Sequence, residues 1–272
     1  MLSLLRGAYV GSFIGGFVFF LLWEAAKPRC PFADANERRR HVLRNLGCLA
    51  LIIVFADIVF GQLLLRTYSL LAAVPAGLLT PLELHWSVQL AFGIVALDLL
   101  VYGWHRLTHA VPLLWRLHRV HHTDTHLDVT TAARFHPLET CANIALVVGV
   151  LMALGIPLWV ELARTLVVQP LLMAQHANVD MGGRWERALR WLLVTPALHR
   201  LHHSPLRAEH DANYGQIFSC WDRWLGTLRA PPSAASRVGL DGFDADRWQS
   251  VAGMMATPLA PSARPLRTRQ PG

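Results

Sequence analysis

Residues 87–109 read SVQLAFGIVALDLLVYGWHRLTH, an apolar run that ends in two histidines spaced four residues apart. Asp98 is the only charged residue of this run before His105. Built as a helix, residues 87–104 would be about 27 Å long, close to the thickness of the hydrocarbon core of a bilayer. The stretch therefore predicts a membrane-spanning helix that delivers His105 and His109 to the membrane surface.

The rest of the chain is also apolar enough for a membrane protein. Of the 272 residues, 53% are hydrophobic and 16% are charged, whereas a soluble domain usually has about 25% charged residues. Further apolar runs cover residues 8–26 and 45–65, and two shorter runs, 140–154 and 158–174, form a hairpin hinged at Gly155-Ile156-Pro157. The hairpin is short for two full spans, so it either crosses the bilayer or enters it part of the way. We predict an all-α integral membrane helical bundle of about four transmembrane helices.

The net charge of +7 comes mainly from arginines in the short loops between apolar runs. Residues 27–44 hold six basic residues against Asp34 and Glu37, and loops of this kind face the cytoplasm in most membrane proteins. This topology makes nucleic acid an unexpected partner. It places the histidine-rich segments and the C-terminus on the cytoplasmic side. The same arginines have a second interpretation, a basic surface for an acidic electron-transfer protein.

The composition divides the chain into three regions. Residues 1–86 hold the N-terminal transmembrane helices and their loops, residues 87–230 hold the histidines of the expected catalytic domain, and residues 231–272 are rich in Ala, Pro, Ser and Arg. The last region predicts a low-complexity tail, disordered over residues 258–272.

Three histidine motifs stand out: HRLTH at 105–109, HRVHH at 118–122 and HRLHH at 199–203. The chain has 14 histidines, and at that frequency an HxxHH motif is expected about 0.04 times by chance. On a helix, spacings of three and four residues place side chains on one face, so each motif can direct imidazoles at one point. The motifs hold more histidines than one metal ion binds, which indicates a two-metal centre in a cytosolic helical cap.

Two other classes of metal protein stay open at this point. A zinc-dependent membrane hydrolase uses about three ligands and a general-base carboxylate, and no glutamate lies inside these motifs. A non-catalytic metal transporter or sensor would hold its ligands near the middle of the bilayer rather than at its surface. Asp98, two helical turns before His105, would either accept a hydrogen bond from a ligand histidine or pair structurally within the bundle.

The order of the motifs resembles that of the fatty acid hydroxylase/sterol desaturase superfamily of integral membrane di-iron oxygenases. The resemblance covers roughly residues 85–230 and extends to DLLVYGWHR at 98–106, DVTTAARFHPLE at 128–139, QHAN at 175–178 and NYG at 213–215. It implies transmembrane helices capped by a cytosolic helical domain that holds two non-haem iron ions. It also implies O₂ as co-substrate and a fatty acyl, sterol-like or related lipid as substrate. That lipid would be hydroxylated or desaturated with electrons from an external cytochrome, ferredoxin or reductase.

The resemblance also implies the residues of the site. The metal ligands would be His105, His109, His118, His121, His122, His199, His202 and His203. His176 would be a ninth, although Asp180 stands where some relatives have a further histidine. His136 would be a ligand or an outer hydrogen-bond donor. Asp98, Glu139 and Asn178, which lie in the matched segments, are the candidate catalytic residues.

Overall fold

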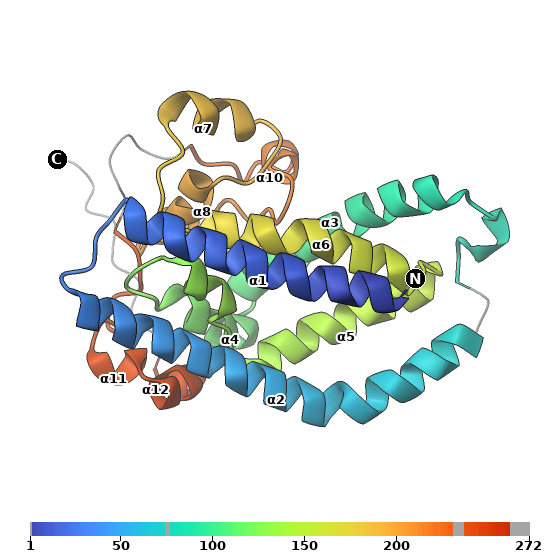
Figure 1. Ribbon diagram of the computed structural model, residues 1–272, viewed down its shortest axis with the longest axis horizontal. Coiled ribbons are helices and arrows are strands. Elements are labelled where there is room, and N and C mark those ends of the chain that lie inside the picture. The colour runs from blue at the N-terminus through green and yellow to red at the C-terminus, as the bar shows by residue number, and fades with distance from the viewer. Residues whose placement is uncertain (1, 74–76, 231–236, 262–272) are drawn as a thin grey trace.

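The computed structural model describes residues 2–73, 77–230 and 237–261, without the side chains of residues 2–6 and 60–73. The described part is helical, apart from loops and one isolated β-bridge between Leu193 and Phe218. Its long helices are α1 (Leu2–Ala26), α2 (Ala35–Ala73), α3 (Trp86–Ala110), α5 (Pro137–Leu154) and α6 (Leu158–His176). Its short helices are α4 (Pro112–His122), α7 (Gly183–Leu189), α8 (Pro196–His202), α9 (Arg207–His210), α10 (Cys220–Trp224), α11 (Asp246–Gln249) and α12 (Val251–Ala256), with the 3₁₀ turns η1 (Thr80–Leu82), η2 (Val129–Ala133) and η3 (Thr257–Leu259). The short helices gather at one end of the long ones and form a cap (Figure 1).

Within the described residues, four helices are long and apolar enough to cross a membrane: Gly7–Ala26, Ala35–Val59, Trp86–Ala110 and Pro137–Leu154. The predicted all-α membrane bundle with a helical cap is thereby confirmed. The expected hairpin is present as α5 and α6, and α6 packs along α1 (Figure 1).

The second span begins earlier than the sequence suggested. We expected a loop up to residue 44, but α2 starts at Ala35 and continues to Ala73. The signal is a reciprocal cap: the Glu37 backbone N–H donates to Asp34 Oδ1 (2.8 Å) and the Ala33 N–H donates to Glu37 Oε2 (2.8 Å). Such a pair satisfies the free N–H groups of a helix start, so the basic residues after it lie on the first turns of the helix.

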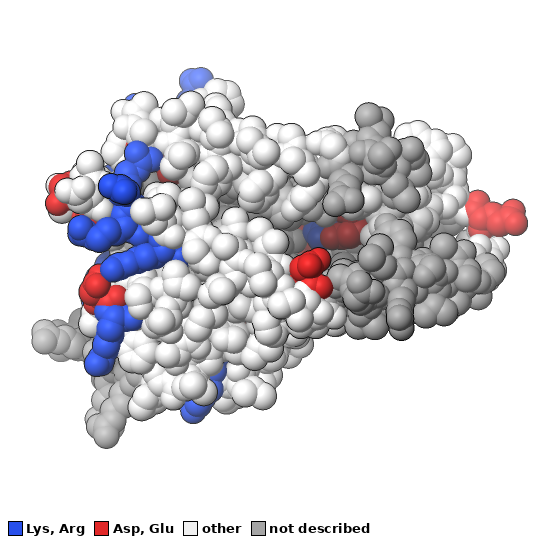
Figure 2. All heavy atoms as spheres, turned by 60° about the horizontal axis from the view of Figure 1, so that its bottom comes forward, with Lys and Arg blue, Asp and Glu red and all other residues white. Residues whose placement is uncertain are grey.

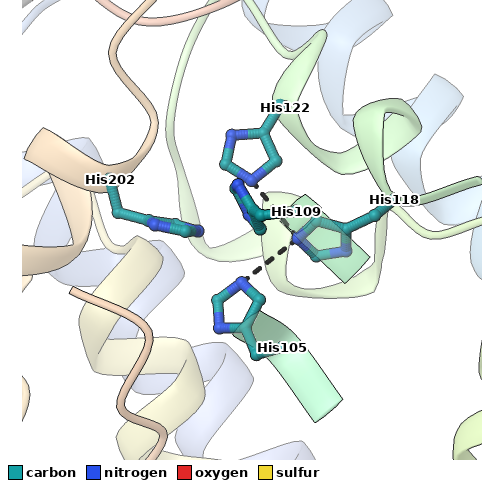
Figure 3. Close-up of side chains that lie close together, drawn as sticks. All are labelled: His105, His109, His118, His122 and His202. Atoms are coloured by element: carbon teal, nitrogen blue, oxygen red, sulfur yellow. Dashed lines mark hydrogen bonds between the residues drawn. The ribbon is translucent and has the colours of Figure 1, made fainter. Parts of the chain in front are cut away.

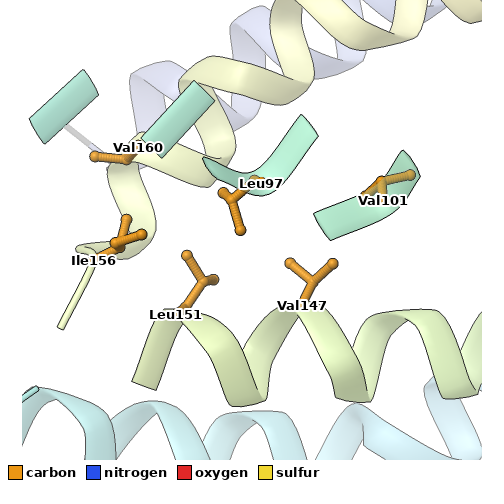
Figure 4. Packing of buried hydrophobic residues seen from close by; sticks show 6 residues of the cluster. All are labelled: Leu97, Val101, Val147, Leu151, Ile156 and Val160. Atoms are coloured by element: carbon orange, nitrogen blue, oxygen red, sulfur yellow. The ribbon is translucent and has the colours of Figure 1, made fainter. Parts of the chain in front are cut away.

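The bundle is held together by an aliphatic core between α3, α5 and α6. Its buried members are Leu97, Val101, Val147, Leu151, Ile156 and Val160 (Figure 4). Gly93 allows α3 and α6 to approach, because a Cβ at this position would lie 2.3 Å from Val160 Cγ1. This core fills the space between the three helices on the side away from the cap.

The chain folds back after the cap, which corrects the expectation of a tail from residue 231 onward. Residues 237–261 include α11, α12 and η3, and Met254 is buried against Cys48 and Val120. The guanidinium of Arg119 is buried and donates to the carbonyls of Thr257 and Ala260 (2.7 Å). A buried cation must find acceptors, and the backbone of this C-terminal segment supplies them. Residues 231–236 and 262–272 of the expected tail lie outside the described residues.

Charge separates the two ends of the molecule. Lys and Arg gather at the cap end, whereas the visible surface over the long helices is largely uncharged (Figure 2). The basic residues there include Arg38, Arg39, Arg40 and Arg44 on the first turns of α2. An uncharged belt suits lipid and a charged end suits water.

Candidate metal centre

The predicted ligands reach one region from four helices. His105 and His109 lie on the last turns of α3, and α4 carries HRVHH. α3 ends at Ala110 and α4 begins at Pro112, whose fixed φ and missing N–H suit the first position of a helix. The chain therefore turns back at once, and the histidine face of α4 packs against that of α3. α6 ends at His176, and α8 with the residue after it carries HRLHH.

These nine histidines form two groups. The five-histidine group is His105, His109, His118, His122 and His202, and the four-histidine group is His121, His176, His199 and His203. Within each group, one possible ligand atom of every residue lies within 4.8 Å of all the others. The rings of the five-histidine group surround a common point (Figure 3). Each group can therefore hold one metal ion.

The ring nitrogens face one another at short distances. In the five-histidine group, His118 Nε2 lies 3.1 Å from His105 Nε2 and 3.3 Å from His122 Nε2. In the four-histidine group, His176 Nε2 lies 3.1 Å from His121 Nε2 and 2.8 Å from His199 Nε2. A neutral imidazole has one donor nitrogen and one acceptor nitrogen, so converging Nε2 atoms cannot all satisfy one another. A bound cation satisfies them together.

Oxygen atoms behind the rings fix which nitrogen faces inward. The Nδ1 atoms of six ligands lie within 3.4 Å of an oxygen: those of His105, His121, His176 and His202 near the carbonyls of Tyr214, Arg134, Leu172 and Ala212, and those of His118 and His109 near the carboxylates of Glu139 and Asp211. A carbonyl oxygen can only accept, so these Nδ1 atoms carry the proton. The Nε2 lone pair is then free for a metal, which is the usual outer arrangement of ligand histidines.

The environment keeps the imidazoles neutral. Burial, reinforced by repulsion from neighbouring histidines, holds the pKa of His121, His122 and His203 well below the usual 6.5. The same causes lower the pKa of His199 and His202. Neutral nitrogen donors of this kind suit iron, zinc, copper and nickel, and only the neutral form can bind a metal.

The sequence profile of the Fatty acid hydroxylase family matches residues 90–227, slightly more than half of the chain. The chain belongs to this family. The resemblance proposed from the histidine motifs is thereby confirmed, and the matched segment contains all nine histidines of the two groups.

Named relatives of this family member are lipid hydroxylases and monooxygenases. The chain is 39% identical to the ornithine lipid hydroxylase OlsE of Rhizobium tropici, over 57% of its own length and 46% of the relative. It is 30% identical to the alkylglycerol monooxygenase of Danio rerio, over 59% of the chain and 34% of the relative. It is 28% identical to the cholesterol 25-hydroxylase of Rattus norvegicus, over 50% of the chain and 45% of the relative. The matched segment thus spans less than half the length of these three relatives, and no solved structure gives a significant match.

A cavity of about 280 Å³ adjoins both histidine groups of this family member. His105 and His118 of one group and His121, His176 and His199 of the other lie in its wall. The remaining wall comes from α3, α5 and α6, from Ala132 and Phe135 before α5, and from the loop at Gly215 and Gln216. A molecule in this cavity would lie beside both candidate metal positions.

Glu139 is the candidate catalytic residue that the fold brings to the centre. Its Oε1 atom lies 2.6 Å from His118 Nδ1, and the residue lines the cavity. α5 begins at Pro137, so Glu139 lies on its first turn directly behind the ring of His118. Its carboxylate holds the ligand by its outer nitrogen.

Asp98 has a structural role, which is one of the two alternatives predicted for it. Its carboxylate accepts from the backbone N–H groups of Ile217 (2.9 Å) and Phe218 (3.1 Å) and from Trp221 Nε1 (2.8 Å). The loop it anchors includes Tyr214, whose carbonyl accepts from His105. Asp98 therefore positions the loop that orients the His105 ring, and lies one step further from the histidine groups than a direct hydrogen bond to a ring would place it.

The Asp98→Asn variant should unfold at a lower temperature. One of the three donors now faces an amide NH₂ that cannot accept, which costs about 1–3 kcal/mol for a buried donor. The measurement is thermal unfolding of the detergent-purified protein, with Asp57→Asn as control because Asp57 is an exposed carboxylate of α2. Equal unfolding temperatures for the two variants would contradict the anchoring role.

Asn178 and His136 are not placed at the centre. The Asn178 side chain pairs with the backbone of Cys30, accepting from its N–H (2.9 Å) and donating to its carbonyl (2.6 Å). It fastens the loop after α1 to the end of α6, which corrects its expected catalytic role. His136 lies outside both groups and is the N-cap of α5, where Nδ1 accepts from the Leu138 N–H (3.2 Å). A ring used to cap a helix has its acceptor nitrogen occupied, so the structure does not support a ligand role for His136, one of the two alternatives predicted for it.

Two carboxylates were missed by sequence reasoning. Asp211 lies 3.4 Å from His109 Nδ1. Asp222 accepts from the backbone N–H groups of Tyr214 and Gly215 (both 2.8 Å) and so holds the same loop as Asp98. Both residues lie inside the segment that the family profile matches, but neither lies in one of the histidine motifs.

Proposed function

We propose that this family member is a membrane-bound di-iron oxygenase that hydroxylates a lipid with O₂ and externally supplied electrons. The observation that carries the proposal is the pair of buried histidine groups bordering one cavity. The names of the relatives, which are hydroxylases and a monooxygenase, favour hydroxylation over desaturation.

Iron fits the donors better than zinc does. Nine imidazoles in groups of five and four exceed the three protein ligands of a catalytic zinc site. In addition, a side-chain acid, base or nucleophile cannot break an unactivated C–H bond. When bound, a pair of redox-active irons supplies the reduction of O₂ and the oxidising power that this bond requires.

The stoichiometry of a hydroxylation determines which atoms, electrons and protons must enter and leave the site. One C–H bond of the lipid breaks and one C–O bond forms. One oxygen atom of O₂ enters the lipid and the other leaves as water, so each turnover takes up two electrons and two protons. The chain's own residues hold the centre for this chemistry: Glu139 and backbone carbonyls orient the rings, and Phe135 stacks on His121 with ring centroids 4.3 Å apart. Burial keeps bulk water from the ligands.

Elemental analysis of protein purified in detergent under low oxygen tests the proposal first. We expect about two irons per chain, matching one ion for each group, and O₂ uptake when a reductant and a lipid are added. One zinc per chain without O₂ uptake would favour the hydrolase. Bound metal without any O₂ uptake would favour the transporter or sensor.

We infer that the cap faces the cytoplasm and receives electrons there from an acidic protein. The basic residues at the cap end support both inferences, because positive loops stay on the cytoplasmic side and attract acidic partners. In inverted membrane vesicles, an impermeant thiol reagent should label the Arg237→Cys variant more strongly than the unchanged protein, whose Cys30 and Cys220 are partly exposed. In right-side-out vesicles the two should be labelled equally. The reverse labelling would overturn the assignment.

A further inference from the structure

The cavity beside the histidines has a polar wall on α5 and α6. Glu139 and Asn143 come from the first two turns of α5, and Gln175 comes from the last turn of α6. Among the residues that the structure describes, Glu139 Oε2, Asn143 Oδ1 and Gln175 Oε1 are buried without a hydrogen-bond partner. Buried polar atoms are normally paired, so a cluster of unpaired ones beside a cavity indicates a missing ligand group.

The unpaired atoms define the chemistry of that group. All three are oxygens, which accept hydrogen bonds. Gln175 cannot be turned to offer its NH₂ instead, because Nε2 already donates to the Gln216 carbonyl (2.6 Å). Glu139 is similarly held, with Oε1 against His118 and Oε2 left over. Two of the three oxygens are thereby held as acceptors, so the group that pairs with them must donate hydrogen bonds, which a hydroxyl or an amine does and a hydrocarbon chain does not.

The depth of the cavity agrees with a polar occupant. Asn143 is six residues into α5, or about 9 Å from the cap end of this span at 1.5 Å per residue. Beyond it the same face of α5 carries Val147 and Leu151, which pack against Leu97 and Val101 of α3 (Figure 4). The aliphatic core thus closes the space between the helices just past Asn143. The cavity lies at the depth where lipid headgroups meet their chains, and it does not continue along the bundle.

We propose that this cavity binds a hydroxyl or amine of the lipid's polar end, and that the oxidised C–H bond lies within a few bonds of that group. This substrate assignment rests on the proposed function. The hydroxyl or amine satisfies the oxygens of Asn143 and Gln175, while Phe135 and Leu172 in the same wall contact the adjoining methylene groups. The carbon next to the bound group then lies beside the histidines.

The probes are three lipids matched in chain length and one sterol. 1-O-hexadecylglycerol carries two hydroxyls, and its 2,3-di-O-methyl derivative has the same skeleton without a donor. N-hexadecanoylornithine carries an amine, and cholesterol carries its apolar side chain far from its hydroxyl. Each is supplied to the iron-loaded full chain with a chemical reductant and O₂, and tandem mass spectrometry locates the added oxygen.

Three variants test the wall. Asn143→Leu removes the polar group with little change in volume, and loss of one substrate hydrogen bond should lower kcat/KM about tenfold through KM, with the iron content unchanged. Asn143→Ser, which restores a hydrogen-bonding group, should recover part of the loss. Ala145→Leu is the matched control, because Ala145 is an exposed residue half a turn away on the same helix.

The expected result is oxygen within about three carbons of a hydroxyl or amine. The methylated probe should be strongly disfavoured, since a site built to bind a donor rejects an analogue that lacks it. The side chain of cholesterol should not be oxidised, because it lies far from the hydroxyl. Oxidation of a mid-chain carbon or of the cholesterol side chain would overturn the substrate assignment while leaving the oxygenase intact. Unchanged kinetics in Asn143→Leu would overturn it as well. If a chain with two irons oxidises none of the probes, the proposed function itself fails.

Discussion

Replacing His121 or His202 with alanine is expected to abolish lipid oxidation, with each change weakening a different metal position. His121 belongs to the four-histidine group and His202 to the five-histidine group. The His121→Ala variant keeps only three histidines in its own group and should lose the ion there. It should retain about one iron per chain, which is the ion of the intact five-histidine group. His202→Ala keeps four ligands and should lose less iron. Iron content and O₂ uptake, measured on the same purified sample, check both expectations.

His126→Ala is the control for these variants. His126 stacks on Phe32, with ring centroids 4.6 Å apart, and belongs to neither group. It should keep wild-type iron content and activity. All three variants should insert into membranes equally, because none changes an apolar span. Full iron content and activity in His121→Ala would contradict the assignment of the four-histidine group as a metal site.

Changes at Glu139 are expected to have the next largest effect. Glu139→Leu leaves His118 Nδ1 without its acceptor, and loss of an outer partner of a ligand typically lowers metal affinity or activity about 10–100-fold. Glu139→Gln keeps an oxygen that can accept from Nδ1 and loses only the charge. We therefore expect activity to fall about 100-fold in the leucine variant and about tenfold in the glutamine variant.

A metal titration separates this role from a general loss of stability. Without metal, both variants should unfold at about the same temperature as the wild type. Their iron affinity should fall in the order wild type, Glu139→Gln, Glu139→Leu. If Glu139→Leu binds iron as the wild type does and still loses activity, Glu139 acts on the substrate and does not orient His118. Wild-type iron affinity together with wild-type activity would remove it from the centre.

Local sequence was sufficient to predict the long helices and the histidines that come together in the two groups. Apolar runs of bilayer length predict spans wherever they occur, and histidines three and four residues apart share a helix face whatever packs against it. The start of α2 was also locally encoded, by the reciprocal pair Asp34 and Glu37, but a run of arginines after it was interpreted as a loop.

The side chains that hold the loops around the centre depend on contacts between distant parts of the chain. The partners of Asp98 lie near residue 220, and the partner of Asn178 is Cys30. No spacing in the sequence reports such pairs. The same holds for Arg119, whose acceptors are backbone carbonyls near residue 260 in a segment that composition marked as a tail.

What the sequence by itself determined is therefore the class of protein: a helical membrane bundle with histidine motifs able to hold two metals. Only the tertiary structure decided how those histidines are shared. His121 and His122 are neighbours in one motif, yet they point about 100° apart around α4 and enter different groups. His176 enters the four-histidine group from α6. Motif spacing determines the directions of side chains around a single helix. Which histidines share a metal position depends on which helices pack together. The buried core and the loops between the helices determine that packing.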